Sequence, residues 1–423
     1  MTMNTLVRDS AITTVARTVD AAMGELVALS HRVHGYAEIA FEEERSARDV
    51  SEQLSAHGFE VESGVGGLST AFVASTGMGS LTVALCAEYD ALPGLGHACG
   101  HNVIAASAVG AALALQAVAD DLDLTVKVIG TPAEEGGGGK ILLLDAGVFD
   151  GTHAALMAHP APADWPVMPC IAIEGFDATF TGRVGSAHKS QGDAINAGNA
   201  MTVTQVALAM LRQELDPTSN FNLVANEVVG TPSMIPAAAS GALFIKAGSL
   251  EALEGLRERV RDCFEAGARA TGASLTLTSK APARSEFRPD PDLVRAWMRH
   301  ALRLGRTFEA LPRTMGWSDI LQQTGATDMA NVSHRIPSIH PLIKMETGGV
   351  GTHDPEFAKF AASPAADAVV RDASALLACT VIEAACDAPV RERLVTEGLS
   401  NEDPDPLLAE IMAGQPNTLI GKA

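Results

Sequence analysis

Positive charge is scarce in this 423-residue sequence, in which 30 Lys and Arg residues stand against 51 Asp and Glu, a net charge of −21. Such an excess of negative charge repels phosphate backbones and anionic membrane surfaces, so neither nucleic acid nor a membrane is an expected partner. Disorder is also excluded, because 47% of the residues are hydrophobic and only 19% are charged. The chain exceeds the ~250–300 residues at which single cores usually stop growing, so two domains are expected.

Export and membrane signals are not expected either. Segment 1–23 carries Arg8 and Arg17 where a signal peptide needs an uncharged apolar stretch, which predicts a cytoplasmic protein. The longest uncharged apolar run, 103–119, is rich in alanine and contains Gln116, so it is predicted to be a buried helix rather than a membrane span. Six cysteines scattered along a chain without an export signal do not indicate a disulfide framework.

Strand and helix patterns alternate in the first part of the chain. After helical patterns that cover most of the first 58 residues, predicted strands and helices follow one another. The strands are expected at 69–76, 81–94, 124–131 and 153–160, and the helices from about 102 and about 139. Alternation of this kind predicts an α/β fold with a doubly wound sheet.

The pattern changes near residue 171 and becomes β-α-β-β-α-β. This order predicts an α+β unit inserted into the larger domain. The expected boundaries are 1–172 and 289–390 for the two parts of the larger domain, 173–288 for the insertion, and 391–423 for an acidic, proline-bearing tail.

Potential metal ligands follow three of the predicted strands. A cysteine with a histidine, a pair of glutamates and a single histidine each lie at or just beyond a different strand end. These residues are Cys99 and His101, Glu134 and Glu135, and His159. Because ligands bind outside the carboxyl ends of strands in doubly wound sheets, we expect them to meet at one edge. Thiolate, imidazole and carboxylate groups together suit zinc and related divalent ions.

Local chemistry sharpens this expectation. Asn102 is expected to cap the following helix, whose N-terminal dipole would favour a thiolate at Cys99. Two adjacent ionised carboxylates repel each other unless a cation separates their tasks, so one of Glu134 and Glu135 can bind metal while the other acts as general base. Each motif also has an interpretation without a metal. Cys99 and His101 could be a buried cysteine beside a loop histidine, Glu134 and Glu135 an exposed acidic turn, and His159 a structural histidine. The glycines after Glu135 indicate closely packed backbone.

Six motifs in order carry a family resemblance: AEYDALPGLGHACGHN, GTPAEEGGGGK, LMAHP, GRVGSAHKSQGDAINA, GATDMANVSHRIPSIHP and GTHDPEF. They resemble the di-metal amidohydrolase and carboxypeptidase family of aminoacylase, hippurate hydrolase, indole-acetyl-amino-acid hydrolase and aminobenzoyl-glutamate hydrolase, and the last group most. The resemblance spans residues 20 to 385, roughly. It implies a zinc-peptidase-like catalytic domain and makes the inserted unit a ferredoxin-like lid and dimerisation domain.

The resemblance also implies roles for single residues. Two divalent ions, Zn²⁺ or alternatively Mn²⁺, would share Cys99, with Glu135 and His353 completing one site and His101 and His159 the other. Glu134 would be the general base, and Asp90 would support the site from behind. His188, which alone would be an ordinary surface histidine, would reach across a homodimer to stabilise the oxyanion.

Residues near the expected substrate depart from the family pattern. Ser233 stands where many members carry asparagine, and Lys246 stands where arginine is usual. Asp328 and His340 are further candidates for the substrate pocket. Glu88 occupies the position of a histidine ligand in the aminopeptidase-like branch, which places the chain in the cysteine-ligand branch. These departures leave the acyl group and the leaving amine open.

The expected function is hydrolysis of the amide bond of an N-acyl amino acid, a dipeptide or a related small amide by metal-activated water. One alternative is a cysteine amidase with Cys99 as nucleophile, which would leave Glu134, Glu135, His159 and His353 unexplained. The other is a small-molecule-binding protein without activity on the same scaffold. The presence of all five ligand candidates and of Glu134 as the candidate base argues against a protein without activity.

Overall fold

The computed structural model describes residues 3–189, 192–308 and 325–400. These residues form two compact units. The first consists of 3–168, 287–308 and 328–400, and the second of 169–286 together with 325–327. The second unit is thus an insertion in the sequence of the first, and it also takes in a short segment from much later in the chain.

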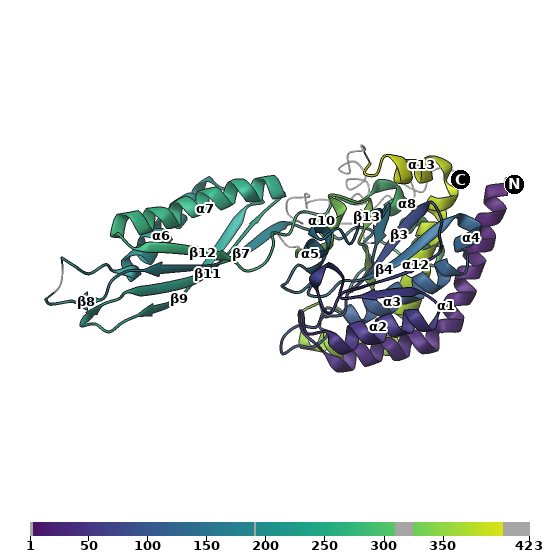
Figure 1. The fold of residues 1–423 in the computed structure, drawn as a ribbon, viewed down its shortest axis with the longest axis horizontal. Coiled ribbons are helices and arrows are strands. Elements are labelled where there is room, and N and C mark those ends of the chain that lie inside the picture. The colour runs from purple at the N-terminus through teal and green to yellow at the C-terminus, as the bar shows by residue number, and fades with distance from the viewer. Residues whose placement is uncertain (1–2, 190–191, 309–324, 401–423) are drawn as a thin grey trace. The chain divides into compact units, whose positions relative to one another are not determined.

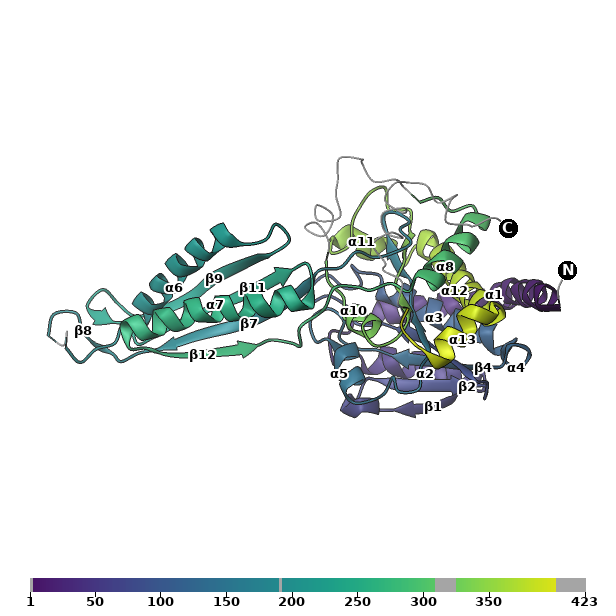
Figure 2. The same ribbon diagram turned by 90° about the horizontal axis from the view of Figure 1, so that it is seen from above.

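A six-stranded mixed sheet forms the centre of the first unit, with the strand order β1-β2-β4-β3-β5-β13 (Figures 1 and 2). Strands β4, β3, β5 and β13 run parallel, and β2 and β1 extend the sheet antiparallel at one edge. The strands are β1 Glu60–Ser63, β2 Phe72–Thr76, β3 Leu81–Ala87, β4 Leu124–Gly130, β5 Ala154–Leu156 and β13 Ser338–Ile339. The first unit therefore has the α/β class that the alternation of strand and helix patterns predicted.

The predicted strand 153–160 is broken in the structure. Its first half is β5, and its second half, β6 (His159–Ala161), leaves the main sheet and pairs with β14 (Leu342–Lys344). Pro160 lies inside β6 and has no N–H to donate, so this segment cannot continue an interior ladder. His159 therefore begins a separate two-stranded ribbon just beyond the carboxyl end of β5.

Three helices build the core beside the sheet. Helix α3 (His101–Gln116) lies against β3 and β4, and α1 (Met3–Tyr36) and α12 (Pro364–Cys386) pack on α3 (Figure 1). Every residue of α3 from His101 to Leu115 is buried, so the long apolar run is a core helix, as predicted. None of the described helices can cross a membrane singly by length and apolarity, and only the bent pair of α12 and α13 (Ala388–Thr396) meets those limits together.

Several helices of this unit begin with a capping side chain followed by proline. Asp290, Asp354 and Ser363 each accept a backbone N–H from the first turn, and the proline supplies a helical φ without needing a hydrogen bond. The other described helices of the unit are α2 Glu44–Ala56, η1 Val65–Gly67, α4 Ala119–Leu122, α5 Gly139–Asp145, α8 Pro291–Arg303, α10 Met329–Ser333, α11 Pro355–Phe360 and α13 Ala388–Thr396.

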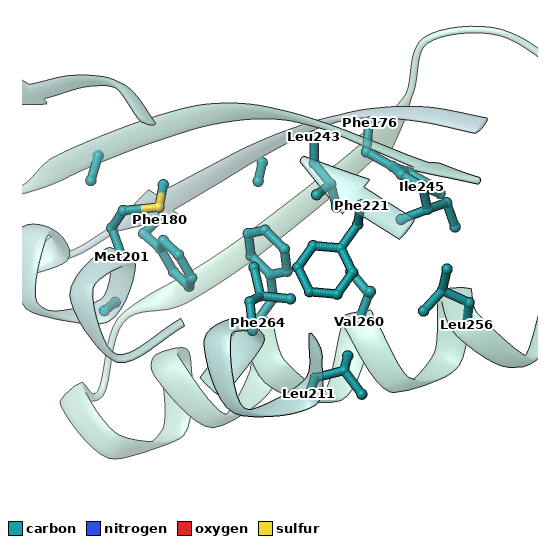
Figure 3. Packing of buried hydrophobic residues seen from close by; sticks show 14 of the residues in the cluster. Phe176, Phe180, Met201, Leu211, Phe221, Leu243, Ile245, Leu256, Val260 and Phe264 are labelled. Carbon is teal, nitrogen blue, oxygen red and sulfur yellow. The ribbon is translucent and has the colours of Figure 1, made fainter. Parts of the chain in front are cut away.

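The second unit is a four-stranded antiparallel sheet, in the order β12-β7-β11-β9, with two helices on one face. Figure 3 shows its core, in which the rings of Phe180 and Phe264 stack with centroids 6.0 Å apart. Its elements are β7 Ala172–Thr181, β8 Gly185–Ser186, α6 Ala197–Leu211, η2 Arg212–Glu214, β9 Asn220–Val229, β10 Met234–Ile235, β11 Ala238–Ala247, α7 Leu250–Thr271 and β12 Ser274–Ser279. Apart from the short β8–β10 pair, the order is β-α-β-β-α-β.

The two ends of this inserted segment are hydrogen-bonded to each other. Ile173, at the start of β7, and Arg284, after β12, exchange two backbone hydrogen bonds of 3.0 Å. The chain thus enters and leaves the unit at neighbouring points. Nearby, the N–H of Ile171 donates to the carbonyl of Gly325 over 3.3 Å, which ties the later segment to the same place.

Candidate metal centre

Five candidate ligands from distant parts of the sequence meet in the first unit. They form two groups, Cys99 with His101 and His159, and Cys99 with Glu135 and His353, and within each group the ligand atoms lie within 4.8 Å of one another. The sulfur of the shared Cys99 is 3.4 Å from His159 Nε2 and 3.6 Å from His353 Nε2. The arrangement is that of two adjoining cation sites with one thiol between them.

Unusual backbone conformations bring these loops together. Gly100 has a left-handed φ of +76°, and a Cβ at this position would approach Pro160 Cγ to 2.6 Å. The glycine therefore allows the Cys99 turn to lie directly on the residue after His159. His353 also has a positive φ, +67°, and its N–H donates to the carbonyl of Ala98 over 2.8 Å. Two ligand loops are thus fixed to the turn that carries the cysteine.

The predicted capping role of Asn102 is wrong. Helix α3 begins at His101 after left-handed Gly100, and no side chain caps it. Asn102 is fully buried, and its amide donates to Ser30 Oγ over 2.9 Å and to the carbonyl of Ala361 over 2.7 Å. Its position inside the first turn points the side chain toward these neighbours, so it joins α1 and the segment after α11 to the start of α3.

The protein alone does not favour a thiolate at Cys99, contrary to the expectation from the helix dipole. Burial raises the pKa of the Cys99 thiol well above its usual range, and the neighbouring Glu134 and Glu135 raise it further. His101 opposes this shift without cancelling it. Burial thus favours the neutral thiol, whereas a bound cation would favour the thiolate.

Asp90 orients two members of the cluster from behind. His101 donates its Nδ1 hydrogen to Asp90 Oδ1 over 2.9 Å, and the backbone N–H of Glu135 donates to Asp90 Oδ2 over 2.9 Å. His159 donates from Nδ1 to the carbonyl of Pro160 over 2.8 Å. Both histidines therefore present Nε2 to the centre, in the manner of metal-bound imidazoles whose other nitrogen is held by a carboxylate or carbonyl.

Two buried atoms at the centre test whether a cation fits. Within the described part of the chain, the buried atoms His101 Nε2 and Glu135 Oε1 make no hydrogen bond, and their nearest charged neighbours, Glu88 Oε2 and His353 Nε2, are each 3.4 Å away. Burial lowers the pKa of His159 to about 4, so its imidazole is neutral and can donate a lone pair. Buried polar atoms that lack a hydrogen bond are destabilising by themselves, and beside a thiol and carboxylates they suit a divalent ion.

Comparison with known proteins identifies the family. The model of the peptidase family M20/M25/M40 matches residues 84–373, which is more than half of the chain and includes all five candidate ligands. The chain belongs to this family. It is accordingly a hydrolase acting on amide bonds, as predicted.

Curated relatives match over much of their length. Xaa-Arg dipeptidase of Mus musculus is 32% identical over 383 residues, which cover 87% of each chain. A p-aminobenzoyl-glutamate hydrolase chain of Escherichia coli (strain K12) is 28% identical over 269 residues, 58% of this chain and 56% of that protein.

Solved structures show the same fold. An aminobenzoyl-glutamate utilization protein from Klebsiella pneumoniae superposes with a TM-score of 0.68 at 19% identity and covers 88% of this chain and 98% of that one. A dinuclear metal-binding peptidase of the M20 family from Bacillus subtilis gives 0.64 at 22% identity and covers 86% and 99%.

A buried charge network that sequence reasoning missed lies beside the ligands of this M20-family protein. Lys140 donates from Nζ to Glu88 and, over 2.8 Å, to Asp328 Oδ1, and none of the three side chains is more than 1% exposed. Glu88 Oε2 in turn is 3.4 Å from His101 Nε2. The only signal in the sequence was a lysine directly after four glycines, where α5 begins.

Asp328, one of the candidates for the substrate pocket, belongs to this buried network. It is fully buried, and its second oxygen accepts the backbone N–H of Lys140 over 2.9 Å. Both oxygens are therefore engaged in anchoring the start of α5. His340 is also buried, with its ring centroid 5.7 Å from that of His159, and within the described residues neither ring nitrogen has a hydrogen-bond partner. Burial lowers its pKa, so it packs as a neutral ring behind a ligand.

Of the predicted residues not yet described, Glu134 lies in the ligand cluster, and His188, Ser233 and Lys246 lie in the second unit. Glu134 is 8% exposed and shares a third group with His101 and Glu135, again within 4.8 Å. In the second unit, His188 is exposed, and its neighbour Ala187 donates its N–H to the carbonyl of Ser233 over 3.0 Å.

Ser233 and Lys246 lie toward opposite ends of the second unit. Ser233 belongs to the β8–β10 end (Figure 1), whereas Lys246 pairs with Ile173 where the chain enters. The stretch of β11 from Ala238 to Lys246 alone extends roughly 26 Å at ~3.3 Å per residue. One small substrate therefore cannot touch both residues of the same copy.

Proposed function

We propose that this protein is a di-metal amidohydrolase that cleaves the amide bond of dipeptides or N-acyl amino acids. The observation that carries the proposal is the shared Cys99, whose sulfur belongs to both groups of ligand atoms. The substrate class is supported by the names of two relatives, an Xaa-Arg dipeptidase and a p-aminobenzoyl-glutamate hydrolase.

The five ligands would hold the ions as two sites. His101 and His159 would complete one, and Glu135 and His353 the other, with Zn²⁺ more favoured than Mn²⁺ by the thiolate. Two divalent ions bound there would supply Lewis acidity that acidifies water and polarises an amide carbonyl. Asp90 would hold His101 and Glu135 in the required orientation through its two oxygens.

Glu134 is the proposed general base. It lies next to two proposed ligands without belonging to either group that contains Cys99. In the reaction its carboxylate takes a proton from the attacking water as the new C–O bond forms. It then gives that proton to the leaving nitrogen as the C–N bond breaks, which returns the carboxylate to its starting state.

The inserted unit is the proposed homodimer surface, which would let His188 of one copy reach the site of the other. Helix α6 has no charged residue and exposes Val203, Val206 and Met210 along one stripe. Beside it, β9 is an edge strand with Val224 and Val228 more than half exposed. An apolar helix stripe next to an open strand edge is typical of surfaces that pair with another chain.

The dimer proposal is tested by placing a charge on the stripe. We expect Val206→Glu to be monomeric in sedimentation velocity and to lose most activity. Gln205→Glu, which adds the same charge outside the stripe on the same helix, should stay dimeric and active. A Val206→Glu protein that remains dimeric would contradict the proposed surface.

The catalytic proposal is tested by separating ligand from base. Glu134→Gln keeps the shape of the side chain and removes proton transfer, so kcat should fall by about 10²–10⁴-fold with two ions per chain retained. Glu135→Gln should instead lower the metal content. Equal metal content and equal activity in both variants would refute the division of roles.

A matched pair of cysteines distinguishes this proposal from a cysteine amidase. Cys99→Ala should lose both metal and activity, whereas Cys86→Ala, a change at a buried cysteine in β3, should keep both. The wild-type enzyme should lose activity to a chelator and regain it with Zn²⁺ or Mn²⁺. Activity that resists chelation and is lost on alkylation would favour a nucleophilic thiol.

A further inference from the structure

The turn that carries Glu134 and Glu135 has a strained backbone. Between β4 and α5, Ala133 adopts a left-handed φ of +60°, a conformation that non-glycine residues rarely take. Its carbonyl accepts the N–H groups of Gly137 and Gly138 over 3.0 and 2.9 Å, which closes the turn. Such a conformation persists only where its surroundings hold it in place.

Glu43, far away in the sequence, holds this turn. It is completely buried just before α2, and its Oε1 accepts the N–H of Ala133 over 2.9 Å. The same oxygen accepts the N–H of Phe41 over 3.0 Å, and Phe41 is also left-handed, with a φ of +64°. Oε2 accepts the hydroxyl of Thr70 over 2.9 Å. One carboxylate oxygen therefore joins two strained residues that are 92 positions apart (133 minus 41).

A second buried carboxylate holds the other side of the turn. Asp90 Oδ2 accepts the N–H of Glu135 over 2.9 Å, so carboxylates hold the backbone N–H groups of the two residues on either side of Glu134. Asp90 also bonds His101 and thereby serves the proposed metal ligands. The side-chain bonds of Glu43 lead instead to Ala133, the residue directly before Glu134, and to Phe41 and Thr70.

We propose that Glu43 is a positioning residue for Glu134, which it holds in the orientation for proton transfer by fixing the N–H of Ala133. This inference rests on the proposed role of Glu134 as general base. A displacement of about 1 Å at such a group can cost about a hundredfold in rate. Because Glu43 acts through the backbone before the base, its loss should lower kcat more than it changes KM or metal content.

The bonds to Glu43 need an acceptor and not a negative charge. Burial raises the pKa of Glu43 to about 7, so the neutral form is accessible in the folded protein. In Glu43→Gln the amide oxygen can still accept both N–H groups, while the NH₂ group donates to the hydroxyl oxygen of Thr70. Glutamine should therefore rescue the position.

The test compares three variants of the metal-loaded enzyme. In Glu43→Met, which keeps the bulk but removes both acceptors, we expect kcat to fall by about a hundredfold with KM and two-ion content nearly unchanged. Glu43→Gln and Thr70→Val should stay within a few-fold of the wild-type kcat, because both keep the bond to Ala133. Equal losses in Glu43→Met and Thr70→Val would mean that general packing is responsible, and would overturn the proposal.

Hydrogen exchange of the metal-free protein gives a readout independent of activity. Peptides covering 131–138 should exchange faster in Glu43→Met than in Glu43→Gln, by about tenfold or more, because the turn opens without its anchor. Should Glu43→Met not fold, Glu43→Ala combined with Ala133→Gly, which removes the strain at the turn, provides the same comparison. Unchanged exchange and unchanged kcat in the acceptor-free variant would refute the inference.

The two proposals fail in different ways. A Glu134→Gln enzyme with normal turnover would refute the base itself, and with it this inference. An inactive Glu134→Gln enzyme together with a fully active Glu43→Met enzyme would leave the base in place and refute only the positioning role.

Discussion

Replacing Lys140 by methionine should destabilise the first unit strongly, although Lys140 is not among the proposed ligands. Its ammonium contacts both Glu88 and Asp328, and all three side chains are at most 1% exposed. The two carboxylates raise the pKa of Lys140 despite burial, so it is charged at any pH of interest. Methionine keeps the length of the side chain and removes that charge.

The expected magnitude follows from what the variant leaves behind. Breaking a buried ion pair by removing one partner typically costs about 3–5 kcal/mol, because the remaining charge stays buried without compensation. We therefore expect the unfolding free energy to fall by about that amount at pH 8. Neutralising the partners as well, in Lys140→Met/Glu88→Gln/Asp328→Asn, should recover most of the loss, since replacing all members of a buried network is often nearly neutral.

Urea unfolding followed by tryptophan fluorescence measures this effect. Trp165 and Trp297 lie in the first unit, and Trp317, outside the described residues, is changed to phenylalanine in every variant. The pH gives an internal check on the mechanism. Unpaired buried carboxylates have raised pKa values in the folded state, so the folded variant binds more protons than the unfolded chain and should regain stability as the pH falls from 8 to 5.5.

Two results would contradict this reasoning. A loss below about 1 kcal/mol at pH 8 would show that the network does not leave an uncompensated charge when Lys140 is removed. A loss that does not shrink at pH 5.5 would show that the damage comes from packing around the methionine rather than from the carboxylates.

Three further predictions concern other parts of the molecule. The hydrogen bond from His300 holds the pKa of Glu383 at about 2, below its usual 4.5. The ionised Glu383 carboxylate therefore stabilises the folded protein above pH 4.5, and this stabilisation is lost as the pH falls toward 2. In thermal unfolding, Glu383→Gln should flatten the decline of stability between pH 5 and 3. Mixing inactive His188→Ala chains with inactive Glu134→Gln chains should restore some activity, and no recovery after demonstrated subunit exchange would exclude action across the dimer. Because Lys246 offers a point charge instead of a planar fork, kcat/KM should fall less than about a thousandfold when an N-acyl amino acid is replaced by the amide of the decarboxylated amine; a larger loss would show strong carboxylate recognition.

The ligand cluster could be predicted from the sequence because its chemistry is visible in single letters. Cys99, His101 and the glutamate pair are residue types that suggest a metal site when they occur together on loops. Because these loops follow strand ends, the residues were expected at one edge of the sheet, and the structure brings them together. The class of the fold followed from the alternation of patterns, as did the core helix α3. These features depend on residue type and local periodicity, both of which a single sequence contains.

Other features depended on contacts that no local pattern encodes. Asn102 has the residue type of a helix cap, but burial against Ser30 gives it a different task. Glu43 and Lys140 act through partners about 50 to 190 positions away, and neither stands in a pattern that names those partners. The break between β5 and β6 was signalled only by Pro160, whose effect depends on whether the strand is interior or at an edge.

The bonded pair of Ile173 and Arg284 has a consequence for how such a protein can change over generations. Because the two ends of the inserted unit lie side by side and hydrogen-bond to each other, 110 residues lie between two anchor points that a tight hairpin could join (284 minus 173, less one). The first unit can keep its own chain path, up to residue 168 and from residue 287 on, when that span is lengthened or exchanged. Selection can therefore alter the inserted unit as a separable module while the metal centre stays the same, and a protein engineer can graft another unit onto the same two positions.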